Sequence, residues 1–114
     1  MTPEQVDATF AALAHPVRRR VLDLLSGRPG MIVGAVASHF DISRIAVMKH
    51  LATLEDAELV LSEKVGRERR LYMNPMPIQQ IYDRWTNQLS GFWASRMADI
   101  KESVERRSEE KKHA

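Results

Sequence analysis

The 114-residue sequence contains no cysteine, which excludes disulfide bonds and thiolate ligands for a metal ion. Its apolar runs are far shorter than the roughly 20 residues that a membrane-spanning helix requires. The first residues do not combine a basic segment with an apolar stretch, as a secretory signal would. These absences predict a cytoplasmic protein without a membrane partner, and the length suits one compact domain.

The sequence also lacks a strong excess of charge of either sign. The formal net charge is +2, so bulk charge alone is weak evidence for a nucleic-acid partner. The basic residues nevertheless gather in two short segments, each with one acidic residue. The first segment holds Arg18, Arg19, Arg20 and Arg28 beside Asp23, and the second holds Lys64, Arg67, Arg69 and Arg70 beside Glu68. These clusters indicate either local contacts with an anion or two solvated surfaces.

The spacing of the apolar residues predicts four helices in the first half of the chain. The first begins after a capping-box pattern at Thr2, and the second begins after His15 with a proline in its first turn. The apolar segment 31–40 is predicted as a third, short helix. A tight turn then leads into a strong helix over residues 43–57, for which Ser43 is a good N-cap residue. The third and fourth helices together predict a helix–turn–helix.

The pattern changes after this helix. Two strand-like runs separated by Gly66 and Arg67 predict a β-hairpin over residues 59–74. Helical spacing returns over residues 77–107, and the highly charged residues 109–114 are expected to fray. The predicted fold class is therefore mainly α with a small β-hairpin (α+β). It is a winged helix-turn-helix over residues 1–108, with the hairpin as the wing and with additional N- and C-terminal dimerisation helices.

The helix over residues 43–57 has the pattern of a recognition helix, which enters the major groove of DNA with polar residues forward. Apolar side chains are expected to anchor it, namely Ile45, Val47, Leu51 and Leu54. Ser43, Arg44, Met48, Lys49 and His50 remain available to bind DNA. Arg44 is placed to reach a guanine edge, whereas Lys49 and His50 resemble phosphate contacts. The alternative is an ordinary amphipathic helix with a solvated face.

The predicted hairpin has a basic tip. Arginine is favoured where a wing enters a narrow minor groove, because that groove concentrates negative potential. Lys64, Arg67 and Arg69 are the predicted contacts with DNA, and strand alternation turns Arg70 to the other face. The alternative is an edge hairpin whose charges prevent aggregation.

Three segments resemble a known family. Residues 43–51 and 54–60 are similar to the recognition helix of ArsR/SmtB-type repressors, residues 14–22 to that family's second helix, and residues 66–72 to its wing. The chain departs from the family with Arg44-Ile45 in place of Gln-Pro, Met48 in place of Ser, and Glu58 in place of Gly. Those first three positions lie on the DNA face in the family, so its base preference does not carry over.

Many members of that family bind metals through cysteines, or through Asp and His pairs on the last helix. This chain has no cysteine, and its histidines outside the charged tail, His15, His39 and His50, lack ligand-type spacing. The predicted last helix, 77–107, contains no histidine. We therefore predict no metal site and no cofactor.

The last predicted helix carries an apolar stripe too long for so small a domain to cover, which is typical of an interface. A two-fold homodimer is the common solution, and the family resemblance implies that the first and last helices form it. The expected interface residues are Phe10, Ile81, Trp85, Leu89, Phe92, Trp93, Met97 and Ile100. Two alternatives are packing on the chain's own domain and a ligand pocket lined by Trp85 and Trp93.

The sequence as a whole predicts a homodimeric repressor that binds duplex DNA at an inverted-repeat operator. Three alternatives stay open for the inducing signal: an unidentified small-molecule effector, a partner protein, or no signal at all. A protein-interaction module that uses the tryptophan-bearing last helix is the alternative to a repressor. An enzyme is not predicted, because the sequence has no phosphate-binding glycine loop and no hydrolase-type serine motif. Glu55 and Asp56 are adjacent in sequence and point to different sides of a helix, so they do not face each other as a catalytic pair.

Overall fold

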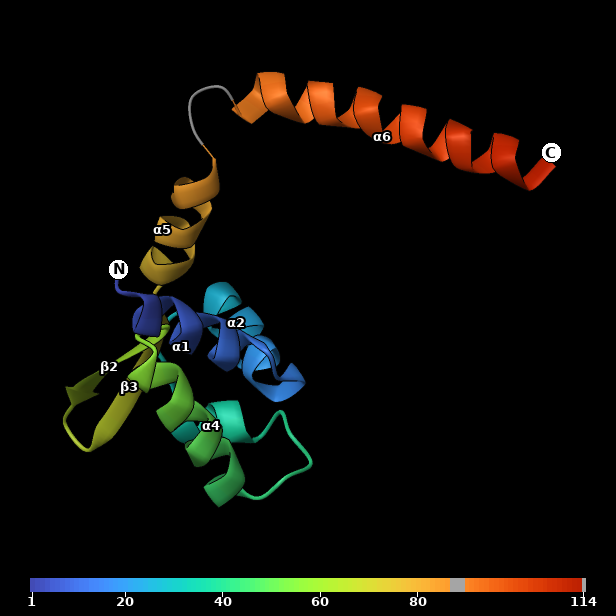
Figure 1. Cartoon of the computed structure of the whole chain (residues 1–114). Helices are drawn as coiled ribbons and strands as arrows, with labels where there is room; N and C mark the ends of the chain where they lie inside the picture. The colour runs from blue at the N-terminus through green and yellow to red at the C-terminus, as the bar shows by residue number, and fades with distance from the viewer. Residues whose placement is uncertain (87–89, 114) are drawn as a thin grey trace. The chain divides into compact units, whose positions relative to one another are not determined.

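The computed structural model describes residues 1–86 and 90–113. They divide into two compact units, Met1–Ile81 and Tyr82–Ala114. The first unit holds helices α1 to α4, a three-stranded sheet and the beginning of α5 (Figure 1). This mainly helical architecture with a small antiparallel sheet confirms the predicted winged helix-turn-helix. The single domain predicted over residues 1–108 stays a prediction.

Helices α1 (Pro3–Leu13) and α2 (Pro16–Gly27) begin where the sequence predicts. The Thr2 hydroxyl accepts a hydrogen bond from the Gln5 backbone N–H at 3.1 Å, and the Gln5 side chain accepts one from the Thr2 N–H at 2.7 Å. This reciprocal pair confirms the capping box. His15 caps α2, because its Nδ1 accepts from the Val17 N–H at 3.1 Å.

The segment 31–40 begins as a strand, so its prediction as one short helix was wrong at that end. Strand β1 (Met31–Ile32) pairs antiparallel with β3 (Glu68–Met73), and α3 is confined to Val33–Ala37. Gly30 directs the chain onto the sheet with a φ of 88°, and its N–H donates to the Leu71 carbonyl at 2.9 Å. A left-handed φ at this point favours glycine.

Helix α4 (Arg44–Asp56) is the predicted recognition helix. The Ser43 hydroxyl caps it by accepting from the Ala46 N–H at 3.1 Å. Val47, Leu51 and Leu54 are buried as predicted, but Ile45 is 68% exposed, so its prediction as a core anchor was wrong. Successive helical residues turn by about 100°. Ile45 therefore lies about 200° from Val47, on the side away from the core.

The turn after α4 has a left-handed residue at Glu58, where φ is 60°. The Leu59 N–H donates to the Leu54 carbonyl and the Glu58 N–H donates to the Glu55 carbonyl, both at 2.9 Å. These two bonds form a Schellman motif, whose left-handed position is usually glycine. The helix end is therefore of the ordinary type, with glutamate in the strained position.

Strands β2 (Val60–Val65) and β3 form the predicted hairpin. Val65 and Glu68 are the last paired residues, and Gly66 alone of the two turn residues has a positive φ, 64°. This pattern is that of a type II′ turn, which suits the twist of a hairpin. The strand order of the sheet is β1-β3-β2.

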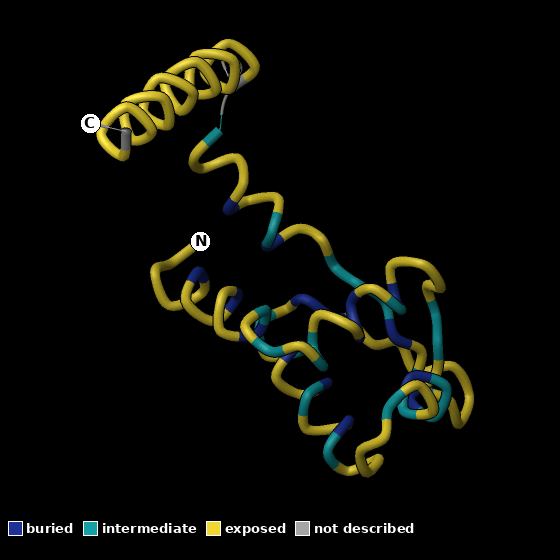
Figure 2. Tube along the Cα trace, turned by 90° about the vertical axis from the view of Figure 1, so that its right-hand side faces the viewer, coloured by how far each residue is buried: buried dark blue, intermediate teal, exposed yellow. Residues whose placement is uncertain are grey.

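One hydrophobic core holds α2, α3, α4 and the sheet together. Its fully buried side chains come from α2, α3, α4 and the sheet. The buried stretches of the chain are dark blue in Figure 2. The fully buried side chains include Val21 and Leu25 of α2, Val36 of α3, Leu51 and Leu54 of α4, Leu59, Val60 of β2 and Leu71 of β3. The core therefore fixes the back of α4 and the base of the hairpin relative to each other.

The helical segment predicted over residues 77–107 is described on both sides of residues 87–89, as α5 (Met76–Trp85) and α6 (Ser90–His113). Residues 109–113 continue α6 in the structure, and the expectation that this charged tail frays stays a prediction. Glutamate and lysine are good helix formers, and a Lys101–Glu105 pair at 3.7 Å adds support within α6. Among the described residues, no helix is both long and apolar enough to cross a membrane.

Candidate nucleic-acid interface

The exposed face of α4 lies opposite the core. Ile45, Met48 and Lys49 are exposed there, and Ser43 and Arg44 are exposed at the N-terminal end. The Arg44 side chain reaches α3, where its Nη1 lies 3.7 Å from the position that a Cβ on Gly34 would take. Within the described part of the chain, neither Arg44 nor Lys49 forms an ion pair. Both cations are therefore available to an external anion.

His50 points instead toward the corner between α1 and α2. The Arg18 guanidinium lies 3.1 Å from the His50 Nδ1, and the His15 and His50 rings are 4.3 Å apart between centroids. Arg18 also donates to the Ala12 carbonyl at 2.7 Å. Burial lowers the pKa of His50, and the adjacent His15 and Arg18 lower it further. The neutral ring can accept from Arg18, so His50 joins α4 to this corner.

The basic side chains of the wing differ in their exposure and in their ion pairs. Lys64 and Arg67 are exposed, with Arg67 in the turn at the tip. Arg69 forms an ion pair with Glu55 of α4, and the Arg70 Nη2 lies 3.7 Å from the Glu68 carboxylate. Among the basic residues of the hairpin, Lys64 and Arg67 are thus the best placed to reach an anion.

The expected interface residues fall into three groups: exposed, buried, and outside the described residues. Phe10, Trp85, Phe92, Trp93, Met97 and Ile100 are exposed. Ile81 is only 8% exposed, and Leu89 lies outside the described residues. Every residue from 91 to 112 is exposed (Figure 2). Trp93, Met97, Ile100 and Val104 recur at intervals of four, three and four, which aligns them on one face of α6.

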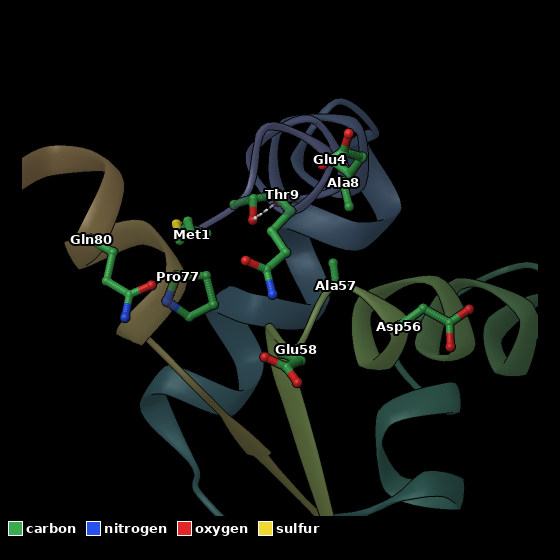
Figure 3. A pocket seen from close by; sticks show the side chains of 10 residues that line it. Met1, Glu4, Ala8, Thr9, Asp56, Ala57, Glu58, Pro77 and Gln80 are labelled. Atoms are coloured by element: carbon green, nitrogen blue, oxygen red, sulfur yellow. Dashed lines mark hydrogen bonds between the residues drawn. The ribbon is translucent and has the colours of Figure 1, made fainter. Parts of the chain in front are cut away.

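A pocket of about 260 Å³ lies between α1, the end of α4 and the start of α5 (Figure 3). Carboxylates of Glu4, Asp56 and Glu58 line it together with Thr9 and Gln80. The Thr9 hydroxyl is already bonded to the Gln5 carbonyl at 2.9 Å. The volume is below the usual range for small-molecule sites, and we assign no ligand to this pocket.

Sequence reasoning missed two features of this site. The pairing of His15 with His50 joins residues 35 positions apart, so no local pattern could reveal it. The exposure of Ile45 could have been found by counting helical positions from Val47. No group of three or more His, Asp or Glu residues in the described ranges could hold a metal ion.

Comparisons with known proteins agree with this geometry. Residues 13–63 match a family described as a helix-turn-helix domain. The chain is 38% identical over 85 residues to the uncharacterised HTH-type transcriptional regulator YuzN of Bacillus subtilis (strain 168), covering 69% of this chain and 92% of that one. It is 40% identical over 58 residues to the transcriptional repressor SdpR of the same organism, covering 51% and 63%.

A solved structure of an ArsR-like transcriptional regulator from Rhodococcus sp. RHA1 superposes with a TM-score of 0.65 at 32% identity, covering 87% of this chain and 92% of that one. The fold, the recognition helix and these relatives lead to the same assignment. The chain belongs to the ArsR family of winged helix-turn-helix proteins, which are DNA-binding transcriptional regulators.

Proposed function

We propose that this protein is a homodimeric repressor that binds an inverted-repeat operator without the aid of a metal ion. The observation that carries the proposal is the position of two cations without an ion-pair partner among the described residues, Arg44 and Lys49, on the exposed side of α4. That helix is held from behind by the same core that fixes the wing. The name of the relative SdpR supports the direction of regulation, because that protein is a repressor.

In the proposed complex the N-terminal half of α4 enters the major groove. Ser43, Arg44, Met48 and Lys49 reach the DNA there, with Arg44 on a guanine edge and Lys49 on a phosphate. Lys64 and Arg67 of the wing bind the adjacent backbone or minor groove. His50 and Arg69 are also predicted contacts. Because each already binds another side chain, we propose that they orient α4 and the wing.

The proposed dimer places two copies of α4 about one helical turn of DNA apart, which requires an inverted repeat. Its interface consists of the exposed apolar residues of α1 and of the C-terminal helices. A small-molecule effector and a cytoplasmic location stay predictions, and the proposal includes no catalytic step.

The test is fluorescence-anisotropy titration of the full chain with duplexes from its own upstream region, beside a scrambled duplex, at low and physiological salt. Specific binding that weakens steeply with salt is expected, because neutralised phosphates release counterions. Equal and weak binding to both duplexes would contradict the proposal and favour the protein-interaction module instead.

A further inference from the structure

Helix α4 presents branched and long apolar side chains on the surface that the proposed function turns toward DNA. Ile45 is 68% exposed and Met48 is 45% exposed. The two residues are three positions apart and are therefore neighbours on one face of the helix. Single exposed apolar residues are common on proteins. Ile45 and Met48 form a local apolar surface in the first half of the recognition helix. It lies beside Lys49 and Arg44, which form no ion pair among the described residues.

The chemistry of the major groove restricts what this surface can contact. Isoleucine has no hydrogen-bond donor or acceptor in its side chain, so it reads neither the polar edges of the bases nor the phosphates. The C5-methyl group of thymine is the apolar group that unmodified DNA displays in the major groove. The N-terminal residues of a recognition helix are those that reach base edges, and Ile45 is the second residue of α4.

From this geometry we infer that Ile45, with Met48 three positions further on the same face, is a specificity-determining residue that recognises a thymine methyl group in each half-site of the operator. The inference rests on the proposed function, because it assumes that this face of α4 meets the major groove. It goes further by stating which base the apolar surface selects and by which atom.

The experiment uses deoxyuridine, which differs from thymidine only by the absence of the C5-methyl group. The full chain first selects its preferred sequence from a randomised duplex library that contains no 5-methylcytosine, so thymine is the only source of the methyl group. Each thymine of the selected duplex is then replaced in turn by deoxyuridine, and the Kd is measured by anisotropy. At one position per half-site the Kd should rise about 4-fold, the value of one buried carbon.

Two variants assign the effect to Ile45. In Ile45→Ala the same deoxyuridine substitution should no longer change the Kd, although the variant binds the thymine duplex more weakly. Alanine is a better helix former than isoleucine, so α4 is retained. Lys49→Ala is the matched control on the same face. It should weaken both duplexes equally and keep the difference of about 4-fold between them.

The outcomes separate this inference from the proposed function. Specific, salt-sensitive binding with no deoxyuridine effect at any position would overturn the inference and leave the proposed function standing. A deoxyuridine effect that persists in Ile45→Ala would assign the methyl contact to another residue and overturn it as well. Failure to select any sequence would overturn both.

Discussion

At the scale of single residues, Glu58 has a strained backbone conformation. The turn requires a left-handed residue at this position, and a glycine would adopt that conformation without strain. A non-glycine residue in the left-handed region costs about 1–2 kcal/mol, and φ is 60° at Glu58. Glu58→Gly removes this cost but gives the unfolded chain more freedom. We expect a net gain that raises the Tm by about 2–5 °C, measured by circular dichroism. Glu58→Ala, which keeps a Cβ, should give no such gain, and an equal rise in both variants would refute the explanation.

His50 makes the stability of the fold depend on pH, and its lowered pKa gives the direction of that dependence. Burial, His15 and Arg18 hold its pKa below the ordinary value of 6.5. Between that value and the lower folded pKa, the unfolded chain binds more protons than the folded chain, so stability falls as pH falls. Above pH 6.5 the contribution of His50 is fully present. We expect the Tm to fall as the pH is lowered from about 7.5 to about 5.

The matched variants for this prediction are His50→Asn and His39→Asn. An asparagine at position 50 keeps an acceptor for Arg18 and does not titrate, so the Tm should depend less on pH. His39 is exposed, and its replacement should preserve the pH dependence of the native chain. The same slope in all three proteins would exclude His50 as the group responsible.

Residue-level prediction from the sequence succeeded where the interaction was local. The caps at Thr2 and Ser43 join residues three positions apart, so their partners follow from spacing alone. It failed where the partner is distant in sequence, as with His50 and Arg18, or Arg69 and Glu55. Those pairs form because the core brings α2, α4 and β3 together, and no single segment contains that information.

At the scale of elements, the wing and the recognition helix are joined by the ion pair between Arg69 and Glu55. Arg67 lies in the exposed turn, so the two arginines should differ in their effects on DNA binding. Arg67→Ala should reduce the slope of log K against log salt by about 0.9 for each phosphate that the wing no longer neutralises. Arg69→Ala should weaken binding with little change of slope, because it removes a support of the wing.

These slopes are measured by anisotropy titrations over a series of salt concentrations. Arg106→Ala is the control, since Arg106 is exposed on α6 and lies about 160° around that helix from Val104. It should leave both the slope and the affinity unchanged. A reduction of slope in Arg69→Ala as large as that in Arg67→Ala would show that Arg69 itself reaches a phosphate.

Element prediction from the sequence was strongest where periodicity was long. Helix α4 and the hairpin were both predicted, because each has a repeated pattern and a clear turn or cap. Strand β1 was missed because it contains only Met31 and Ile32. Two residues define no period, and their extended conformation depends on pairing with β3, which comes much later in the chain.

At the scale of the whole molecule, α6 has a row of exposed apolar side chains along one face. Trp93, Met97, Ile100 and Val104 are exposed on one face, although a helix of this length in water gains most of its stability from covering such a face. In the dimer that we propose, a second copy of the chain provides an equivalent face, and two-fold pairing lets each stripe cover the other. Trp93, Met97 and Ile100 of this stripe were expected as interface residues from the sequence, and the proposed partner is the same stripe in a second copy.

Val104→Glu tests the dimer in the full chain, because it places a charge within the stripe and would bury it unpaired in the dimer. Light scattering coupled to size exclusion should show two chains, about 26 kDa, for the native protein and one chain of 13.0 kDa for the variant. Operator affinity should fall to that of a single half-site. Ala98→Glu adds the same charge about 120° around α6 from Val104 and should remain dimeric. Two outcomes would contradict this prediction: a native chain that elutes as a monomer, and a Val104→Glu dimer as stable as the native one. Either would show that the stripe is not the dimer interface on which two-fold operator recognition depends.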